Sequence, residues 1–250
     1  MLFLERWLTS SLASALLENM TFYLVELFSG TGSFGSAARE VAEGAGMAFR
    51  KLSVDIHPKY NPNTCTDILR WDYESDLAAF LRDRREDDLL WVHASPPCNE
   101  FSIMKNGQQR NLPLADSIVQ RALAIIEHLK PTYWTIENPK GLLQKRPYMA
   151  ALDKHKHLTS YCCWGRPFRK DTHLWSNLTL DLPVCRAGTH CGQKLATGKH
   201  ALSAKDRDTR AGDGTLLRER VSTDRLYAIP PELCAAVVRA GMRSALSGDR

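Results

Sequence analysis

Short apolar segments alternate with amphipathic helical segments over the first 150 residues, and this alternation most constrains the fold. The predicted strands are Phe22–Phe28, Lys51–Ile56, Leu89–His93 and Tyr133–Ile136. Helices are predicted between them, and the segment from Leu114 to Leu129 carries apolar side chains at helical spacing. Such alternation is typical of a parallel sheet with right-handed crossovers. We therefore predict an α/β fold with helices on both faces of the sheet.

Each predicted strand is followed by small, polar or reactive residues. Gly30-Thr31-Gly32 follows the first strand, Asp55 ends the second, Pro97-Cys98 follows the third and Glu137-Asn138 the fourth. The carboxyl ends of parallel strands share one rim, and ligands bind there. The sequence therefore predicts a single site built from four strand ends.

The first of these groups has the spacing of a ligand-binding turn. Gly30, Gly32 and Gly35 follow a G-x-G-x-x-G pattern between a strand and a helix, which lets the backbone approach a nucleotide-like ligand. Asp55 can accept hydrogen bonds from ribose hydroxyls. A tight structural turn fits the same pattern, and the pattern does not separate NAD from S-adenosylmethionine (SAM).

The third and fourth groups carry reactive chemistry. Two prolines stiffen the backbone before Cys98, and a cysteine attacks as the thiolate, so a fixed position suits a nucleophile. Glu137 can bind or protonate a polar ring edge beside it. The alternative to a nucleophile is a cysteine that serves only as a small buried apolar side chain. We prefer that interpretation for Cys65, Cys162, Cys163 and Cys234.

Together these motifs resemble the cytosine-5 DNA methyltransferase family, most closely its compact viral and phage-type members, over roughly residues 22–178. Phe28–Phe34 resembles the SAM-binding motif, and Asp55 matches the acid after the second strand. Thr66-Asp67-Ile68 resembles the motif that contacts the adenine of the cofactor. Ser95–Ser102 resembles the catalytic Pro-Cys loop, and Glu137-Asn138 the base-recognition motif.

The resemblance implies a SAM-dependent methyltransferase (Rossmann-like) fold. It also implies methyl transfer from SAM to carbon 5 of a flipped-out cytosine in double-stranded DNA, with S-adenosylhomocysteine as product. The implied catalytic residues are Cys98, Glu137, Arg169, Pro97 and Asn138. The implied cofactor-binding residues are Phe28, Gly30, Thr31, Gly32, Ser33, Phe34, Asp55, Ile56, Asp67, Ile68 and Pro96.

The sequence departs from the family pattern at three places. Glu26 stands where an aspartate is usual, and Pro139 follows Asn138 where valine is common. The arginine motif is matched only by Arg166-Pro-Phe-Arg169-Lys170, where we favour Arg169. Three alternatives stay open: a cytosine-5 methyltransferase of RNA (tRNA type), a catalytically silent DNA-binding regulator, and an NAD-dependent oxidoreductase. The last explains neither Cys98 nor Glu137.

Composition changes along the chain and indicates how it is organised. We expect a helical N-terminal extension over residues 1–20, a SAM-binding catalytic domain over 21–178, a small basic target-recognition lobe over 179–222, and a C-terminal helix over 223–250 that returns to the catalytic domain. Residues 1–150 hold 16 Lys/Arg and 18 Asp/Glu, whereas residues 151–250 hold 17 and 10. A basic lobe suits contacts with DNA phosphates, although a solvated loop fits equally well.

The lobe also contains Cys185, His190, Cys191 and His200, which are suitable zinc ligands. Their spacing matches no standard finger, so a metal-free loop is favoured and structural zinc is the alternative. We find no secretory signal and no apolar run near the roughly 18–20 residues that span a bilayer. The seven cysteines do not form a disulfide pattern, so we expect an intracellular protein with reduced thiols. We also favour a monomer.

Overall fold

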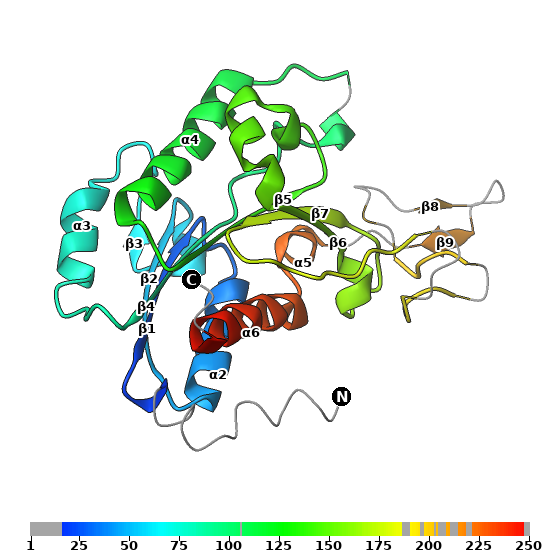
Figure 1. Cartoon of the computed structure of the whole chain (residues 1–250). Coiled ribbons are helices and arrows are strands. Elements are labelled where there is room, and N and C mark those ends of the chain that lie inside the picture. Colours follow the sequence, from blue (N-terminus) through cyan, green and yellow to red (C-terminus); the bar gives the residue numbers. More distant parts are fainter. Residues whose placement is uncertain are drawn as a thin grey trace.

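The computed structural model describes residues 17–105, 107–186, 191–195, 198–202, 204, 209–210, 215–218 and 222–247. Its main element is a seven-stranded sheet in the order β3-β2-β1-β4-β5-β7-β6 (Figure 1). The strands are β1 (Thr21–Leu27), β2 (Ala48–Asp55), β3 (Thr64–Cys65), β4 (Leu89–Ala94), β5 (Tyr133–Pro139), β6 (Lys156–Ser160) and β7 (Asp171–Ser176). The N-terminal extension expected over residues 1–20 lies mostly outside the described residues.

The sheet is parallel from β3 through β5, as the alternating sequence pattern predicts. The strand β7 departs from that prediction, because it pairs antiparallel with both β5 and β6. In the β5–β7 ladder Glu137 lies opposite Leu174, and Pro139 lies opposite Thr172. The second half of the chain thereby adds side chains to the rim where β5 ends.

Helices cover both faces of the sheet, which confirms the predicted α/β class (Figure 1). Alternate residues of one strand serve the two faces. The helices are α2 (Ser33–Gly44), α3 (Tyr73–Phe80), α4 (Leu112–Leu129), α5 (Thr223–Tyr227) and α6 (Pro231–Ser247). On β1, Phe22 and Leu24 pack with α2 and α6, whereas Tyr23 and Val25 pack with α3 and α4. Short 3-10 turns are η1 (Pro58–Tyr60), η2 (Ile103–Lys105), η3 (Leu143–Lys145), η4 (Pro147–His155) and η5 (Tyr161–Trp164).

The last helix, α6, completes one of the two cores. Leu233, Val237 and Met242 are buried against the face that also buries Trp91. Gly241 lies directly over the Trp91 ring, and a Cβ at that position would collide with it. The helix α6 therefore packs beside α2 on one face of the sheet.

The described part of residues 179–222 contains little regular structure. The strands β8 (Thr209–Arg210) and β9 (Leu216–Arg218) pair antiparallel, and an isolated bridge joins Lys194 to His200. Among the described residues, no helix combines the length and apolarity that a membrane span requires.

Candidate functional site

The glycine turn after β1 needs unusual backbone conformations. Phe28, Gly30 and Gly32 all have positive φ, at 56°, 47° and 70°. The Gly32 amide donates to the Ser29 carbonyl at 2.8 Å, and α2 begins at the next residue. Positive φ at two glycines is the conformational reason for those residue types. The turn brings backbone atoms to the rim of the sheet.

Asp55 connects this turn to the end of β2. Its Oδ2 accepts a hydrogen bond from the Gly30 amide at 2.8 Å, and its Oδ1 accepts one from the His57 amide at 2.8 Å. The next residue, Ile56, is an exposed aliphatic side chain, with 57% of its surface accessible. A carboxylate beside an exposed apolar side chain is an arrangement that suits a polar sugar attached to a flat base.

Glu26, where the family usually has aspartate, is accommodated by a glycine. Its Oε1 accepts from the Gly35 amide at 2.9 Å, and Lys51 lies 3.5 Å from its Oε2. Burial raises the pKa of Glu26, and the Lys51 charge opposes that rise. A Cβ at Gly35 would collide with the Glu26 carboxylate, so the third glycine of the motif makes room for the longer acid.

The loop that carries Cys98 is fixed from two sides. The Ser95 amide donates to the Leu27 carbonyl at 3.2 Å, and Asn138 Nδ2 donates to the Pro96 carbonyl at 2.9 Å. After the cysteine, the Phe101 amide donates to the Cys98 carbonyl at 3.0 Å. Asn138 is buried and does not line the cavity that lies at this rim beside Cys98, so it positions the loop rather than contacting a ligand.

Two hydroxyl groups orient Glu137. The Tyr161 hydroxyl donates to Glu137 Oε1 at 2.8 Å, and the Thr172 hydroxyl donates to the same oxygen. Burial and the nearby Glu137 charge raise the pKa of Tyr161 well above its usual value, so the phenol remains a donor. Sequence reasoning missed both hydroxyls, because they reach Glu137 only through the antiparallel insertion of β7 and the turn η5.

Cys98 is partly exposed at the cavity wall. Burial raises the pKa of its thiol, the Lys170 charge lowers it, and the Glu137 charge raises it. Lys170 is held by a hydrogen bond from its Nζ to the Leu226 carbonyl at 3.0 Å, and it lies over the Tyr161 ring at 4.6 Å. The residue that favours the thiolate is thus a lysine that the sequence analysis did not select.

His93, at the end of β4, supports the floor of the cavity. Its ring stacks on Phe34 with centroids 3.8 Å apart and an interplanar angle of 2°. Its Nδ1 lies 2.8 Å from Thr135 Oγ1, and its Nε2 lies 3.0 Å from Ser95 Oγ. Burial lowers the pKa of His93 to about 3, so the ring is neutral near pH 7.

A single cavity of about 280 Å³ joins these features. Most of the residues predicted for the site contribute to its wall. They are Phe28, Gly30, Thr31, Ser33, Phe34, Asp55, Ile56, Asp67, Ile68, Pro96, Pro97, Cys98 and Glu137. The four strand ends therefore converge as the sequence analysis predicts. Lys170, Tyr227 and Ile229 also line the cavity and were not predicted.

Three predicted residues do not contribute to the described wall: Gly32, Asn138 and Arg169. Arg169 instead makes a bidentate ion pair with Asp171, with distances of 2.9 Å from Nε and 2.7 Å from Nη2. Its neighbour Lys170 faces the cavity in its place. Of the cysteines that we expected to be buried, Cys65 is exposed and Cys163 is half-buried.

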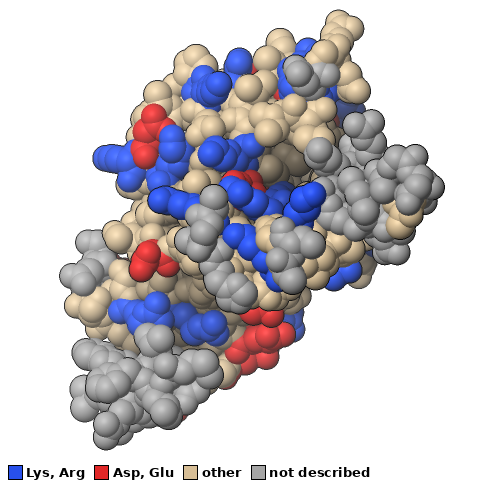
Figure 2. All heavy atoms as spheres, turned by 90° about the vertical axis from the view of Figure 1, so that its right-hand side faces the viewer, with Lys and Arg blue, Asp and Glu red and all other residues tan. Residues whose placement is uncertain are grey.

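Lys and Arg side chains gather on the face of the molecule that contains the small lobe. Figure 2 shows this face, which is the side of β8 and β9 in Figure 1. The lobe residues Lys194 and Lys199 are described, whereas Lys205, Arg207 and Arg220 lie outside the described residues. A cationic face beside the cavity suits a polyanion.

Comparisons with known proteins show which proteins this chain is similar to. The family model described as C-5 cytosine-specific DNA methylase matches residues 22–161. The chain is similar to a probable DNA (cytosine-5)-methyltransferase of Frog virus 3 (isolate Goorha), at 29% identity over 241 residues, covering 84% of this chain and 95% of that protein. A solved methyltransferase of Entamoeba histolytica overlaps 92% of this chain and 99% of its own, at 10% identity and a TM-score of 0.47.

Proposed function

This chain belongs to the C-5 cytosine-specific DNA methylases, and from that membership we propose that it transfers a methyl group from SAM to carbon 5 of cytosine in DNA. Cys98 is the nucleophile and Glu137 holds the base. The observation that supports this assignment is the single cavity lined both by Cys98 and Glu137 and by the glycine turn with Asp55. A thiol, a carboxylate and a nucleoside-type pocket in one cavity suit a covalent reaction on a base beside a bound cofactor.

The donor set of the cavity suits an adenosyl cofactor. Asp55 offers carboxylate oxygens to ribose hydroxyls, and Ile56 and Ile68 offer apolar surface to the adenine. Asp67 lies beside them with its Oδ1 accepting from the Leu69 amide, which leaves its Oδ2 for a polar edge of the base. The backbone of the glycine turn would hold the amino-acid end. SAM would supply an electrophilic methyl group on its sulfonium.

The reaction begins with a cytosine extruded from the duplex, which costs a few kcal/mol in unstacking and unpairing. The Cys98 thiolate forms a bond to carbon 6, and the electron pair of the 5,6 double bond moves toward carbon 5. Glu137 accepts a hydrogen bond from the exocyclic amine and supplies a proton to the ring nitrogen as the thiolate adds, which stabilises the negative charge that develops there. Carbon 5 would then take the methyl group that bound SAM supplies, which would leave S-adenosylhomocysteine as the product.

The adduct resolves by elimination. Carbon 5 loses its proton to a base, the 5,6 double bond re-forms, and the carbon–sulfur bond breaks to return the Cys98 thiolate. Among the described residues lining the cavity, His93 is neutral but hydrogen-bonded at both ring nitrogens, so it is poorly suited to accept this proton. We assign that role to solvent.

The base carbonyl needs a cationic or hydrogen-bonding partner. The family resemblance assigns this role to Arg169, but both the Nε and Nη2 of Arg169 are paired with Asp171. Lys170 lines the cavity and its charge acts on Cys98. We therefore propose Lys170 for this role, while Arg169 remains paired with Asp171.

DNA would approach the face that contains the lobe. The supporting observation is the concentration of Lys and Arg on that face (Figure 2). Such contacts position DNA without reading its sequence, and they make affinity depend on salt. Neutralising Lys194 and Lys199 together is expected to flatten the slope of log affinity against log salt, measured by fluorescence anisotropy with duplex DNA.

A covalent trap tests the function directly. Duplex DNA with 5-fluorocytosine is incubated with the protein and SAM, because fluorine at carbon 5 blocks elimination and keeps the adduct. We expect a protein–DNA band on a denaturing gel that disappears in Cys98→Ser and persists in Cys65→Ser, which changes an exposed cysteine. Trapping on RNA but not on DNA would move the assignment to an RNA methyltransferase. SAM binding without any adduct would indicate a silent regulator.

A further inference from the structure

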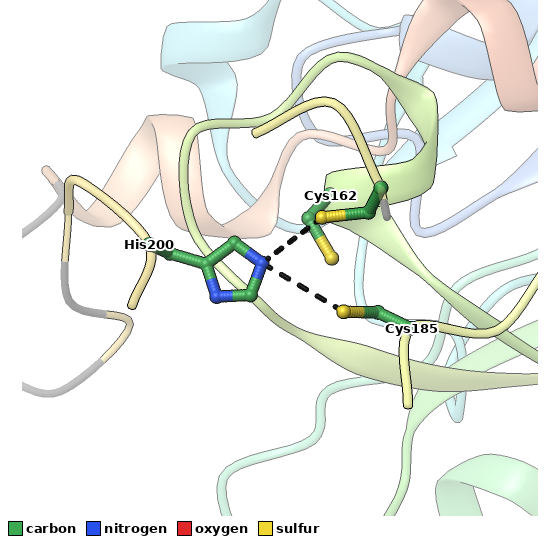
Figure 3. A group of neighbouring side chains, drawn as sticks. Cys162, Cys185 and His200 are labelled. Atoms are coloured by element: carbon green, nitrogen blue, oxygen red, sulfur yellow. Dashed lines mark hydrogen bonds between the residues drawn. The ribbon is translucent and has the colours of Figure 1, made fainter. Parts of the chain in front are cut away.

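A second group of reactive side chains lies outside the cavity, where the lobe meets the catalytic sheet. It consists of Cys162, Cys185, Cys191 and His200. Figure 3 labels Cys162, Cys185 and His200. Cys162 belongs to η5, directly after β6, and Cys185 follows β7. Cys191 and His200 come from the lobe. These four residues converge although up to 38 positions separate them in the sequence.

The distances among their ligand atoms suit one small metal ion. All four atoms lie within 4.8 Å of one another. His200 Nε2 is 3.3 Å from Cys191 Sγ and 3.8 Å from Cys185 Sγ. A tetrahedral zinc ion, with bonds of about 2.3 Å to sulfur and about 2.0 Å to nitrogen, spaces its ligands by roughly 3.5–3.8 Å. The two printed spacings of His200 are close to these values, and the whole group needs to contract only slightly around an ion.

The surroundings also suit a structural metal. Cys162 and Cys185 are fully buried, and His200 is 9% exposed. Cys191 is partly exposed. Three sulfurs and an imidazole give a closed set of four ligands with no position left for a substrate. Cys163 is adjacent in sequence but does not belong to the group, so the convergence is not a by-product of neighbouring cysteines.

Hydrogen bonds link this group to the β6–β7 pair. The Cys185 amide donates to Ser160 Oγ at 3.0 Å, and the Ser160 hydroxyl donates to Asp171 Oδ1 at 2.7 Å. Asp171 is the partner of Arg169. The Leu202 amide, just after His200, donates to the Pro167 carbonyl at 3.0 Å. A metal here would fix the lobe segment against the strand pair that also supplies Thr172 to Glu137.

We propose that Cys162, Cys185, Cys191 and His200 bind one structural Zn²⁺ ion that fastens the lobe to the catalytic sheet. This set differs from the zinc set that the sequence analysis gave as the alternative to a metal-free loop. His190 lies outside the described residues, and Cys162, which we had interpreted as a small buried side chain, takes the fourth position. The proposal does not depend on the proposed methyl transfer, because it concerns a different group of residues.

Elemental analysis of the full chain, purified without chelators, is expected to give about one zinc per chain. Cys185→Ser and Cys191→Ser should lose the metal. Cys65→Ser and Cys163→Ser, which change cysteines outside the group, should keep it. His200→Cys should also keep it, since four thiolates are a common zinc set. A folded wild-type chain without zinc, or ligand variants with undiminished zinc, would overturn the proposal.

A second measurement covers the case in which the ligand variants fail to fold. In the wild-type chain, alkylation followed by peptide mass spectrometry should find Cys162, Cys185 and Cys191 protected, and a chelator should make Cys185 and Cys191 reactive. Replacement of zinc by Co²⁺ should give intense visible bands and thiolate charge-transfer bands of a tetrahedral site. Unchanged alkylation with the chelator, or a disulfide among these cysteines, would count against a metal.

Discussion

The rim of the sheet and the small lobe are built on different physical principles. At the rim, each loop is held by hydrogen bonds from another strand end, as Gly30 is by Asp55 and Pro96 by Asn138. Beneath it, buried side chains fill both faces of the sheet. The described part of the lobe has one short strand pair, an isolated bridge and the cysteine–histidine group. The rim is stabilised by a core, whereas the proposed metal would cross-link the lobe.

The first prediction tests the chemistry proposed for the rim of the sheet and has the largest expected effect. Glu137→Gln keeps the shape of the side chain and removes its charge, while Tyr161 and Thr172 still have an acceptor. We expect single-turnover methyl transfer to fall about 100-fold to 1000-fold, as when one preorganised electrostatic group is lost. SAM binding and thermal stability should be unchanged. A rate within about tenfold of wild type would exclude Glu137 from charge stabilisation.

The second prediction tests whether the core stabilises the rim. Gly241→Ala places a methyl group against the Trp91 ring. Overpacking of this kind costs about 1–3 kcal/mol, and we expect the free energy of unfolding in urea to fall accordingly. Gly44→Ala is the matched control, because a Cβ there meets no atom within 4 Å. That control should be neutral or stabilising by up to about 1 kcal/mol. Equal effects of the two substitutions would contradict the packing described for α6.

The same contrast explains what the sequence could predict. The strand-end groups follow from local patterns, because a strand, a turn and its polar residues are consecutive in the chain. Cys98, Glu137, Asp55 and the glycine turn were predicted for that reason, and they line one cavity. The cysteine–histidine group has no such local pattern. Cys162 lies 23 positions before Cys185, and only the β6–β7 pairing brings them together.

Arg169 and its neighbour Lys170 differ in where they point. They lie just before β7, and a motif match does not fix which of two neighbouring residues faces the cavity. The structure has Arg169 paired with Asp171 and Lys170 at the cavity. Tyr161 and Thr172 were missed for a related reason, because the antiparallel direction of β7 was not predicted.

The third prediction compares Lys170 with its neighbour Arg169. The Lys170 charge lowers the pKa of Cys98, and burial, the larger effect, raises it. Adduct formation requires the thiolate, so its rate should increase with pH and approach a plateau above the raised pKa. In Lys170→Ala the pKa should rise further, and the rising part of the profile should move to higher pH. Arg169→Ala should leave its position unchanged. A profile that moves with Arg169 and not with Lys170 would reverse the assignment.

The smallest expected effect concerns α5, which contacts η1 and the loop after Cys98 at the edge of the cavity. Lys59 Nζ and the Tyr60 hydroxyl both donate to Asp224 Oδ1 at 3.1 Å, and the Tyr227 hydroxyl donates to Asn99 at 3.2 Å. These bonds hold α5 over the cofactor side of the cavity. They are exposed to solvent, so each contributes little and is weakened by salt.

We therefore expect Asp224→Ala to increase the SAM dissociation rate a few-fold at low ionic strength, measured by stopped-flow fluorescence, and the difference from wild type to shrink as salt is added. Asp83→Ala is the matched control, since Asp83 forms an exposed ion pair with Arg50 at 3.5 Å and does not line the cavity. If α5 restrains the cofactor, only Asp224→Ala changes the dissociation rate. If both variants behave alike, the cofactor is retained by the sheet rim alone, and the connection through α5 serves the fold rather than the site.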